Sequence, residues 1–266
     1  MNRITRTFDR LREQGKKAFV AYVAAGDPDY ARSLEILRGL ADAGADVLEL
    51  GLPFSDPLAD GVVNQMAAER ALKSGMTTRR VIELIREFRQ THDTPIVLFT
   101  YLNPIFAYGF EKFQADAVAA GADGILLLDL PPDEAGQSQD FDGNPDLLRI
   151  RLIAPNTPEP RAKMLAAKAE GFIYALSRTG VTGAHGAPST QIGSLVAALK
   201  QHAVVPVCVG FGISNAEQAR EVALHADGVI VGSALVKQVE LHAHEQKPVD
   251  AVVAFAKDLI AAVHSV

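Results

Sequence analysis

Three carboxylates stand close together where an apolar run meets a proline-rich loop. The run Val47-Leu48-Glu49-Leu50-Gly51 places a glutamate among apolar residues, and the loop after it carries Asp56 and Asp60. Alternation along a strand puts Glu49 on the same face as Val47. Burial there would raise the pKa of Glu49 and let it donate a proton near neutral pH. The alternatives are an exposed or ion-paired glutamate and ordinary turn aspartates.

Two glycine-bearing segments further along the chain form a second candidate site. Gly210-Phe211-Gly212 and Gly232-Ser233 each follow a short apolar run. Glycines let backbone N–H groups approach phosphate oxygens closely, and the hydroxyl of Ser233 can add a donor. Either segment alone could be an ordinary turn. Together they predict a phosphate site, because the loops after the last two strands of a barrel form one in this way.

The elements that must position these residues form a repeating pattern. Short runs rich in leucine or β-branched residues are each followed by a loop and an amphipathic helical stretch. We predict eight strands, at Phe19–Ala24, Val47–Leu50, Ile96–Thr100, Gly124–Leu128, Arg149–Ile153, Phe172–Ala175, Val205–Val209 and Gly228–Val231. This pattern predicts an α/β fold, a (β/α)8 TIM barrel that spans residues 1–266 as a single domain. A doubly wound sheet is the alternative, but no Gly-x-Gly-x-x-Gly follows the first strand.

Helix boundaries are also visible in the sequence. Ile4, Phe8 and Leu11 fall on one helical face, which predicts an extra helix before the first strand. The segment Ala43-Gly44-Ala45-Asp46 recurs as Ala120-Gly121-Ala122-Asp123. We interpret both as joints between a helix and the next strand, with glycine at the left-handed end of the helix.

The composition narrows the class of protein. The chain carries 26 basic and 32 acidic residues, a net charge of −6, which argues against nucleic acid as a partner. No apolar stretch is long enough to span a membrane, and the acidic residues near the N-terminus argue against a targeting segment. Cys208 stands alone in an apolar run, so we expect a buried hydrophobe. A single cysteine suits the reducing cytoplasm.

The segment around the carboxylates resembles a known family. The run Glu49-Leu-Gly-Leu-Pro-Phe-Ser-Asp-Pro-Leu-Ala-Asp60-Gly61 is similar to the signature of tryptophan synthase α subunits. Further similar segments follow in order over nearly the whole chain, at Gly26-Asp27-Pro28, Tyr101, Asp129, Leu176-Ser177-Arg178-Thr179-Gly180-Val181-Thr182-Gly183, Gly210-Phe211-Gly212-Ile213-Ser214 and Gly232-Ser233-Ala234. The resemblance therefore goes well beyond one shared motif.

The resemblance implies a lyase of tryptophan biosynthesis. Its reaction would be the retro-aldol cleavage of indole-3-glycerol phosphate to indole and glyceraldehyde 3-phosphate. Glu49 and Asp60 match the two catalytic carboxylates of the family. The substrate and its phosphate would be bound by Tyr22, Tyr101, Asp129, Tyr174, Gly183, Gly210, Phe211, Gly212, Gly232 and Ser233. Apolar loop and strand-end residues should sandwich the ring, unless they are ordinary core, namely Tyr22, Phe211 and Ile153.

The resemblance also implies moving parts and a partner. Arg178 and Thr182 would belong to a lid, with Thr182 bonding Asp60 when it closes, whereas the alternative is a plain flexible loop. The partner would be a tryptophan synthase β subunit in an α2β2 complex. The docking surface would include Pro53, Asp56, Pro57 and Asn103.

We expect neither a metal nor a cofactor. Cleaving a C–C bond beside a carbinol needs an electron sink, and no predicted strand holds a lysine for a Schiff base. The seven histidines form no metal-ligand pattern. An indole ring can serve as its own sink, so that carboxylates suffice.

Three positions beside the expected indole pocket depart from the family pattern. Val62 and Asn64 stand where a proline and an apolar residue are usual, and Tyr22 stands where phenylalanine is. These changes bear on the polarity of the pocket and leave the catalytic pair intact. Two other functions stay open. One is a different phosphate-binding barrel enzyme, such as indole-glycerol-phosphate synthase, which would want lysines at strand ends. The other is a weakly active barrel that mainly binds and activates a β subunit.

Overall fold

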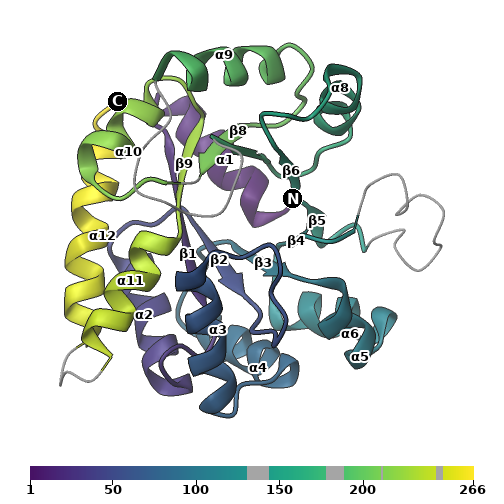
Figure 1. Cartoon of the computed structure of the whole chain (residues 1–266), viewed down its shortest axis with the longest axis vertical. Helices are drawn as coiled ribbons and strands as arrows, with labels where there is room; N and C mark the ends of the chain where they lie inside the picture. Colours follow the sequence, from purple (N-terminus) through teal and green to yellow (C-terminus); the bar gives the residue numbers. More distant parts are fainter. Residues whose placement is uncertain (131–143, 178–188, 211, 244–247) are drawn as a thin grey trace.

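Parallel strands lie at the centre of the molecule, with helices around them (Figure 1). The computed structural model describes residues 1–130, 144–177, 189–210, 212–243 and 248–266. The strands are β1 (Ala18–Ala24), β2 (Val47–Gly51), β3 (Ile96–Thr100), β4 (Gly124–Leu127), β5 (Leu148–Arg149), β6 (Arg151–Ile153), β7 (Ile173–Leu176), β8 (Val207–Gly210) and β9 (Gly228–Val231). They pair in the order β5-β4-β3-β2-β1-β9-β8-β7-β6.

The two edge strands close this sheet into a barrel. β5 pairs with β4 and β6 pairs with β7, and only Ile150 separates β5 from β6 along the chain. The backbone N–H of Ile150 still bonds the carbonyl of Ile125 at 2.9 Å. The strand predicted at Arg149–Ile153 is therefore one barrel strand divided at its middle. The predicted TIM barrel is confirmed, with β7 and β8 starting one and two residues later than expected.

Helices surround the barrel, and one of them, α1, closes an end of it. They are α1 (Arg3–Glu13), α2 (Tyr30–Asp42), α3 (Val62–Lys73), α4 (Thr78–Phe88), α5 (Leu102–Tyr108), α6 (Phe110–Ala120), α8 (Glu159–Ala167), α9 (Ser189–Lys200), α10 (Ala216–Ala223), α11 (Ser233–His242) and α12 (Pro248–His264). The long α12, yellow in Figure 1, packs against α2, α10 and α11. None of the helices in the described ranges is long and apolar enough to cross a membrane.

Alternation along the strands divides the core into two layers. Leu48 and Leu50 join the outer layer between sheet and helices. Val47 and Cys208 lie in the inner layer, which fills the barrel interior. The apolar face of α1 packs onto this inner layer, so the predicted extra helix is confirmed and closes the barrel end formed by the strand starts. Cys208 is fully buried there, as expected.

The repeated joints anchor the strands at the end of the barrel that α1 closes. Aspartates at the joints each accept a backbone N–H at or near the start of a neighbouring strand. Asp46, Asp123 and Asp227 bond the N–H groups of Phe19, Ile96 and Val207, each at 2.9 Å. Gly121 ends α6 in the left-handed conformation at φ 99°, as predicted. These joints fix the strand starts, and hence the positions of the side chains at the opposite end.

Candidate active site

Glu49 is buried inside the barrel. It alternates in β2 with Leu48 and Leu50, which face the helices. Its side chain is 0% exposed, and neither carboxyl oxygen has a hydrogen-bond partner among the described residues. Burial raises the pKa of Glu49 from 4.5 to about 8, because no water stabilises the charged form. Near neutral pH Glu49 is therefore a neutral acid that can donate a proton.

Asp60 lies at the end of the loop after β2 and is held in place by its neighbours. Tyr101 donates a hydrogen bond from its hydroxyl to Oδ2 of Asp60 at 2.9 Å. The same hydroxyl accepts the N–H of Ala59 at 3.0 Å, and the ring of Phe54 packs on that of Tyr101 with centroids 5.5 Å apart. Burial raises the pKa of Asp60 above its ordinary value, and hydrogen bonds from Tyr101 and Asn64 offset only part of this rise. These contacts fix the carboxylate at the rim of the barrel.

Two tyrosine hydroxyls lie over glycines at strand ends. A Cβ on Gly51 would lie 2.5 Å from the hydroxyl of Tyr22, and one on Gly210 would lie 2.6 Å from that of Tyr174. Glycine is therefore required at both strand ends to make room for the hydroxyls. Burial first, and then the nearby carboxylates including Glu49, raise the pKa of both tyrosines. Both hydroxyls stay protonated and can donate hydrogen bonds.

A cavity of about 220 Å³ opens at the carboxyl ends of the strands, and we call it the central cavity. It is lined by Tyr22, Ala59, Asp60, Gly61, Asn64, Phe99, Leu128, Leu152, Tyr174, Leu176, Gly212, Ile213, Ile230, Gly232 and Ser233. We refer to Asp60 and Asn64 as its carboxylate side and to Gly212, Gly232 and Ser233 as its glycine side. The rest of the wall is mostly apolar, as a planar aromatic ring would require.

The glycine side has the features of an anion site. Ser233 is the first residue of α11 and Gly232 is its N-cap, so the partial positive charge of a helix N-terminus lies at the cavity wall. Gly212 has φ 75°, and a Cβ there would meet nothing within 4 Å. The backbone at Gly212 therefore borders open space. No cluster of acidic, histidine or cysteine side chains suited to a metal ion occurs in the described part of the chain.

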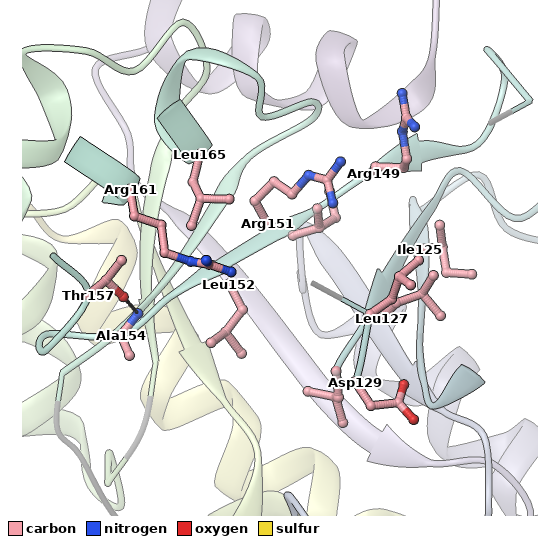
Figure 2. Close-up of a pocket in the computed structure, with 13 residues that line it drawn as sticks. Ile125, Leu127, Asp129, Arg149, Arg151, Leu152, Ala154, Thr157, Arg161 and Leu165 are labelled. Carbon is pink, nitrogen blue, oxygen red and sulfur yellow. Dashed lines mark hydrogen bonds between the residues drawn. The ribbon is translucent and has the colours of Figure 1, made fainter. Parts of the chain in front are cut away.

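A second cavity is lined by residues of β4, β5, β6 and α8 (Figure 2), and it shares Leu128 and Leu152 with the central cavity. It measures about 290 Å³, and Asp129 lines it together with Arg151 and Arg161. The carboxylate of Asp129 accepts the backbone N–H of Leu102 at 2.8 Å, which supports the start of α5. Asp129 is not among the residues that line the central cavity. Its role in substrate binding stays a prediction.

The structure brings most of the described site residues together. The central cavity gathers Tyr22, Asp60, Tyr174, Gly212, Gly232 and Ser233, whereas Glu49, Tyr101 and Gly210 are not among the residues that line it. Arg178, Thr182, Gly183 and Phe211 lie outside the described residues. Of the expected docking residues, Asp56 and Asn103 are exposed, whereas Pro53 and Pro57 are half-buried.

The structure also corrects the expected ring contacts. Ile153 does not reach the central cavity, because it is 1% exposed and packs in the outer layer. Its neighbour Leu152 lines the cavity instead. Phe99 lines it too and was not predicted, although its ring packs on that of Tyr22 with centroids 5.1 Å apart. Alternation in β3, with Val97 and Phe99 on one face, is the signal that could have found it.

Comparisons with known proteins identify the family. A family model described as tryptophan synthase alpha chain matches residues 8–264. A tryptophan synthase alpha chain from Desulfosudis oleivorans is 48% identical over 240 residues, which cover 90% of this chain and 91% of that protein. The crystal structure of tryptophan synthase subunit alpha from Legionella pneumophila str. Paris matches with a TM-score of 0.90, at 38% identity and 100% coverage of both chains. A structure of Mycobacterium tuberculosis tryptophan synthase matches with a TM-score of 0.87 and 34% identity, over 99% of this chain and 98% of that one. The chain therefore belongs to the tryptophan synthase alpha chain family, the lyases of tryptophan biosynthesis.

Proposed function

We propose that this chain cleaves indole-3-glycerol phosphate to indole and glyceraldehyde 3-phosphate, with Glu49 as the acid–base group. The observation that carries the proposal is the fully buried carboxyl of Glu49, which has no partner among the described residues and whose pKa is raised to about 8. A carboxylic acid whose pKa lies close to the pH at which it works is suited to giving up and recovering a proton.

Glu49 performs both proton transfers in this proposal. The neutral acid first gives its proton to C3 of the indole ring. The resulting carboxylate then takes the proton of the hydroxyl on the carbon attached to C3. The bond between that carbon and C3 breaks, its electrons return to the ring, and the carbon becomes the aldehyde of glyceraldehyde 3-phosphate. Glu49 ends the cycle protonated, so no metal or cofactor takes part.

Asp60 stabilises the positive charge that protonation places on the ring. Its carboxylate accepts the indole N–H bond, which strengthens as the charge develops. The hydroxyl of Tyr101 fixes this carboxylate at 2.9 Å and opposes the effect of burial on its pKa. Asp60 thus has hydrogen bonds that favour its ionised form, whereas Glu49 has none among the described residues, and this difference suits the two carboxyls to different roles.

The glycine side of the central cavity holds the phosphate. Ser233 and the backbone of Gly232 stand at the N-terminus of α11, which favours an anion. Gly212 leaves room for the phosphate to approach the backbone. By family resemblance, Gly183 and Phe211 would complete the contacts and Arg178 and Thr182 would cover them.

Membership of the family implies a β-subunit partner. We propose that the loop Pro53–Asp60 and the start of α5 contact it, within an α2β2 complex. Leu58 in the loop is 91% exposed and Phe106 in α5 is 63% exposed. Exposed apolar side chains of this size are suited to a protein interface. Such docking could also act on Asp60 through the loop.

The chain is proposed to work as one barrel domain in the cytoplasm. A continuous outer core layer runs from Phe19 to Val263 and ties both ends of the barrel sequence together. The lone Cys208 is buried, which is consistent with a compartment that keeps thiols reduced.

The test is incubation of the purified protein with indole-3-glycerol phosphate, with and without a purified β subunit. We expect indole and glyceraldehyde 3-phosphate in equal amounts, and faster release when the β subunit is present. Release only in the presence of the β subunit would favour the alternative, a barrel that mainly activates its partner. Absence of indole under both conditions would refute the proposed reaction.

A further inference from the structure

Asn64 presents an unused hydrogen-bond acceptor to the central cavity. It lies in the first turn of α3 and lines the cavity, at a position where the family resemblance led us to expect an apolar residue. Its Oδ1 is buried and has no hydrogen-bond partner among the described residues. One turn later, Ala67 packs in a small cluster with Tyr22, which places Asn64 on the helix face that looks toward Tyr22. The acceptor is therefore part of the wall that would surround the ring.

The contact with Asp60 determines which atom of the Asn64 amide has no hydrogen-bond partner. Hydrogen bonding from Asn64 lowers the pKa of Asp60, so its donor group faces that carboxylate. Only the NH2 group of an amide can donate to a carboxylate. The carbonyl oxygen must then be the atom turned away from Asp60. Its free lone pairs are a property of the site and do not depend on how the amide is drawn.

Tyr22 adds a second polar group to the same wall. Its hydroxyl lies over Gly51, and the side chain lines the central cavity together with Asn64. Phenylalanine, the usual residue here, would supply the same ring without the hydroxyl. Tyr22 and Asn64 thus replace two apolar side chains by a donor–acceptor pair.

A plain indole ring cannot satisfy these groups. Its one polar hydrogen is the ring N–H, which the proposed function assigns to Asp60. An apolar C–H edge would leave the oxygen of Asn64 desolvated and unpaired, which is unfavourable. On the basis of the proposed function, we infer that the site is selective for an indole-3-glycerol phosphate whose benzene ring carries a hydrogen-bond donor, a hydroxyl or an amino group, held by Asn64 and Tyr22.

The test is the reverse reaction, the condensation of substituted indoles with glyceraldehyde 3-phosphate. The panel is indole, the four indoles hydroxylated at positions 4 to 7 of the ring, and the four methylindoles of matching position. Methyl and hydroxyl groups are similar in size, so each methylindole controls for steric fit. We expect one hydroxyindole to exceed its methyl counterpart by about tenfold in kcat/KM, which corresponds to about 1.4 kcal/mol.

Two variants test whether Asn64 and Tyr22 cause the preference for a hydroxyindole over its methyl counterpart. Asn64→Leu keeps the number and branching of the side-chain heavy atoms and removes both polar groups, and Tyr22→Phe removes only the hydroxyl. Asn64→Leu should bring the hydroxyl-to-methyl ratio close to one, and Tyr22→Phe should lower it. Equal ratios for the wild type and Asn64→Leu would overturn the inference. An equal loss for every indole in Asn64→Leu would also overturn it, because Asn64 would then serve Asp60 alone.

Binding of the same panel, measured by titration calorimetry, separates this inference from the proposed reaction. If no indole condensed but the hydroxyindole bound about tenfold more tightly than its methyl counterpart, the lyase proposal would fail and the selectivity would stand. If all indoles condensed equally and bound equally, the lyase proposal would stand and the selectivity would fail.

Discussion

The buried carboxyl of Glu49 should make the protein less stable as the pH rises, and Glu49→Gln should remove this dependence. Burial holds the pKa of Glu49 at about 8 in the folded protein, against 4.5 for an ordinary glutamate. Between these two values the folded state keeps a proton that the unfolded chain has released. The free energy of unfolding therefore falls as the pH rises through this window, and becomes level above the folded pKa.

The magnitude follows from the width of the window. Each pH unit corresponds to about 1.4 kcal/mol for one group, so the window of Glu49 gives an upper limit of about 5 kcal/mol. Structural relaxation and entry of water reduce such penalties. We expect about 2–5 kcal/mol of stability to be lost from wild type across the window through Glu49 alone.

The assay is urea unfolding of wild type and Glu49→Gln at about pH 5 and about pH 8. Gln has the same shape as Glu and never ionises, so the two proteins should agree to within about 1 kcal/mol at the lower pH. At the higher pH the variant should be more stable by about 2–4 kcal/mol, because the two pH values lie about three units apart. Glu35→Gln, at an exposed position of α2, is the matched control and should follow wild type at both pH values. Parallel pH dependence of wild type and Glu49→Gln would refute a buried neutral carboxyl.

Three further variants probe the rest of the site. Asp60→Asn should reduce the rate of indole release by about 10²–10³-fold, while titration with glyceraldehyde 3-phosphate shows unchanged affinity; a parallel loss of that affinity would make Asp60 a binding or folding residue. Gly212→Asp should weaken the binding of indole-3-glycerol phosphate and of glyceraldehyde 3-phosphate by about tenfold or more. The substitution adds a negative charge to the glycine side and strains a backbone at φ 75°. Unchanged affinity for either compound would place the phosphate site elsewhere. Asp56→Ala should lower the stimulation of cleavage by a β subunit and spare the basal rate, and equal stimulation of variant and wild type would move the interface to another face.

Much of the fold could be predicted because strand and helix patterns are local. The run around Glu49 shows the alternation of a strand, and Gly121 marks a helix end whether or not the rest of the chain is known. Closure of the barrel is not local. The division of the fifth strand at Ile150, where the strand changes its partner from β4 to β7, depends on contacts between distant segments.

The site was harder to predict where the orientation of a strand decided it. Alternation puts Val47 and Glu49 on one face, but only the closed barrel shows that this face is the interior. For Ile153 the alternative of an ordinary core residue holds, because an apolar side chain alone does not distinguish a ring contact from core. Ile153 alternates with Leu152 and shares a face with Arg149 and Arg151, and this face packs in the outer layer. The hydrogen bond between Tyr101 and Asp60 joins the residue that follows β3 to the loop after β2, and no spacing in the sequence indicates it.

The most direct test of the proposed chemistry is the rate of indole release from indole-3-glycerol phosphate by Glu49→Gln beside wild type. Both proteins should bind glyceraldehyde 3-phosphate equally, which shows that the glycine side is intact. Gln can neither donate nor recover a proton, so the rate should fall by at least about 10²–10⁴-fold. A Glu49→Gln protein that released indole within a few-fold of the wild-type rate would contradict the assignment of Glu49 as the acid–base group.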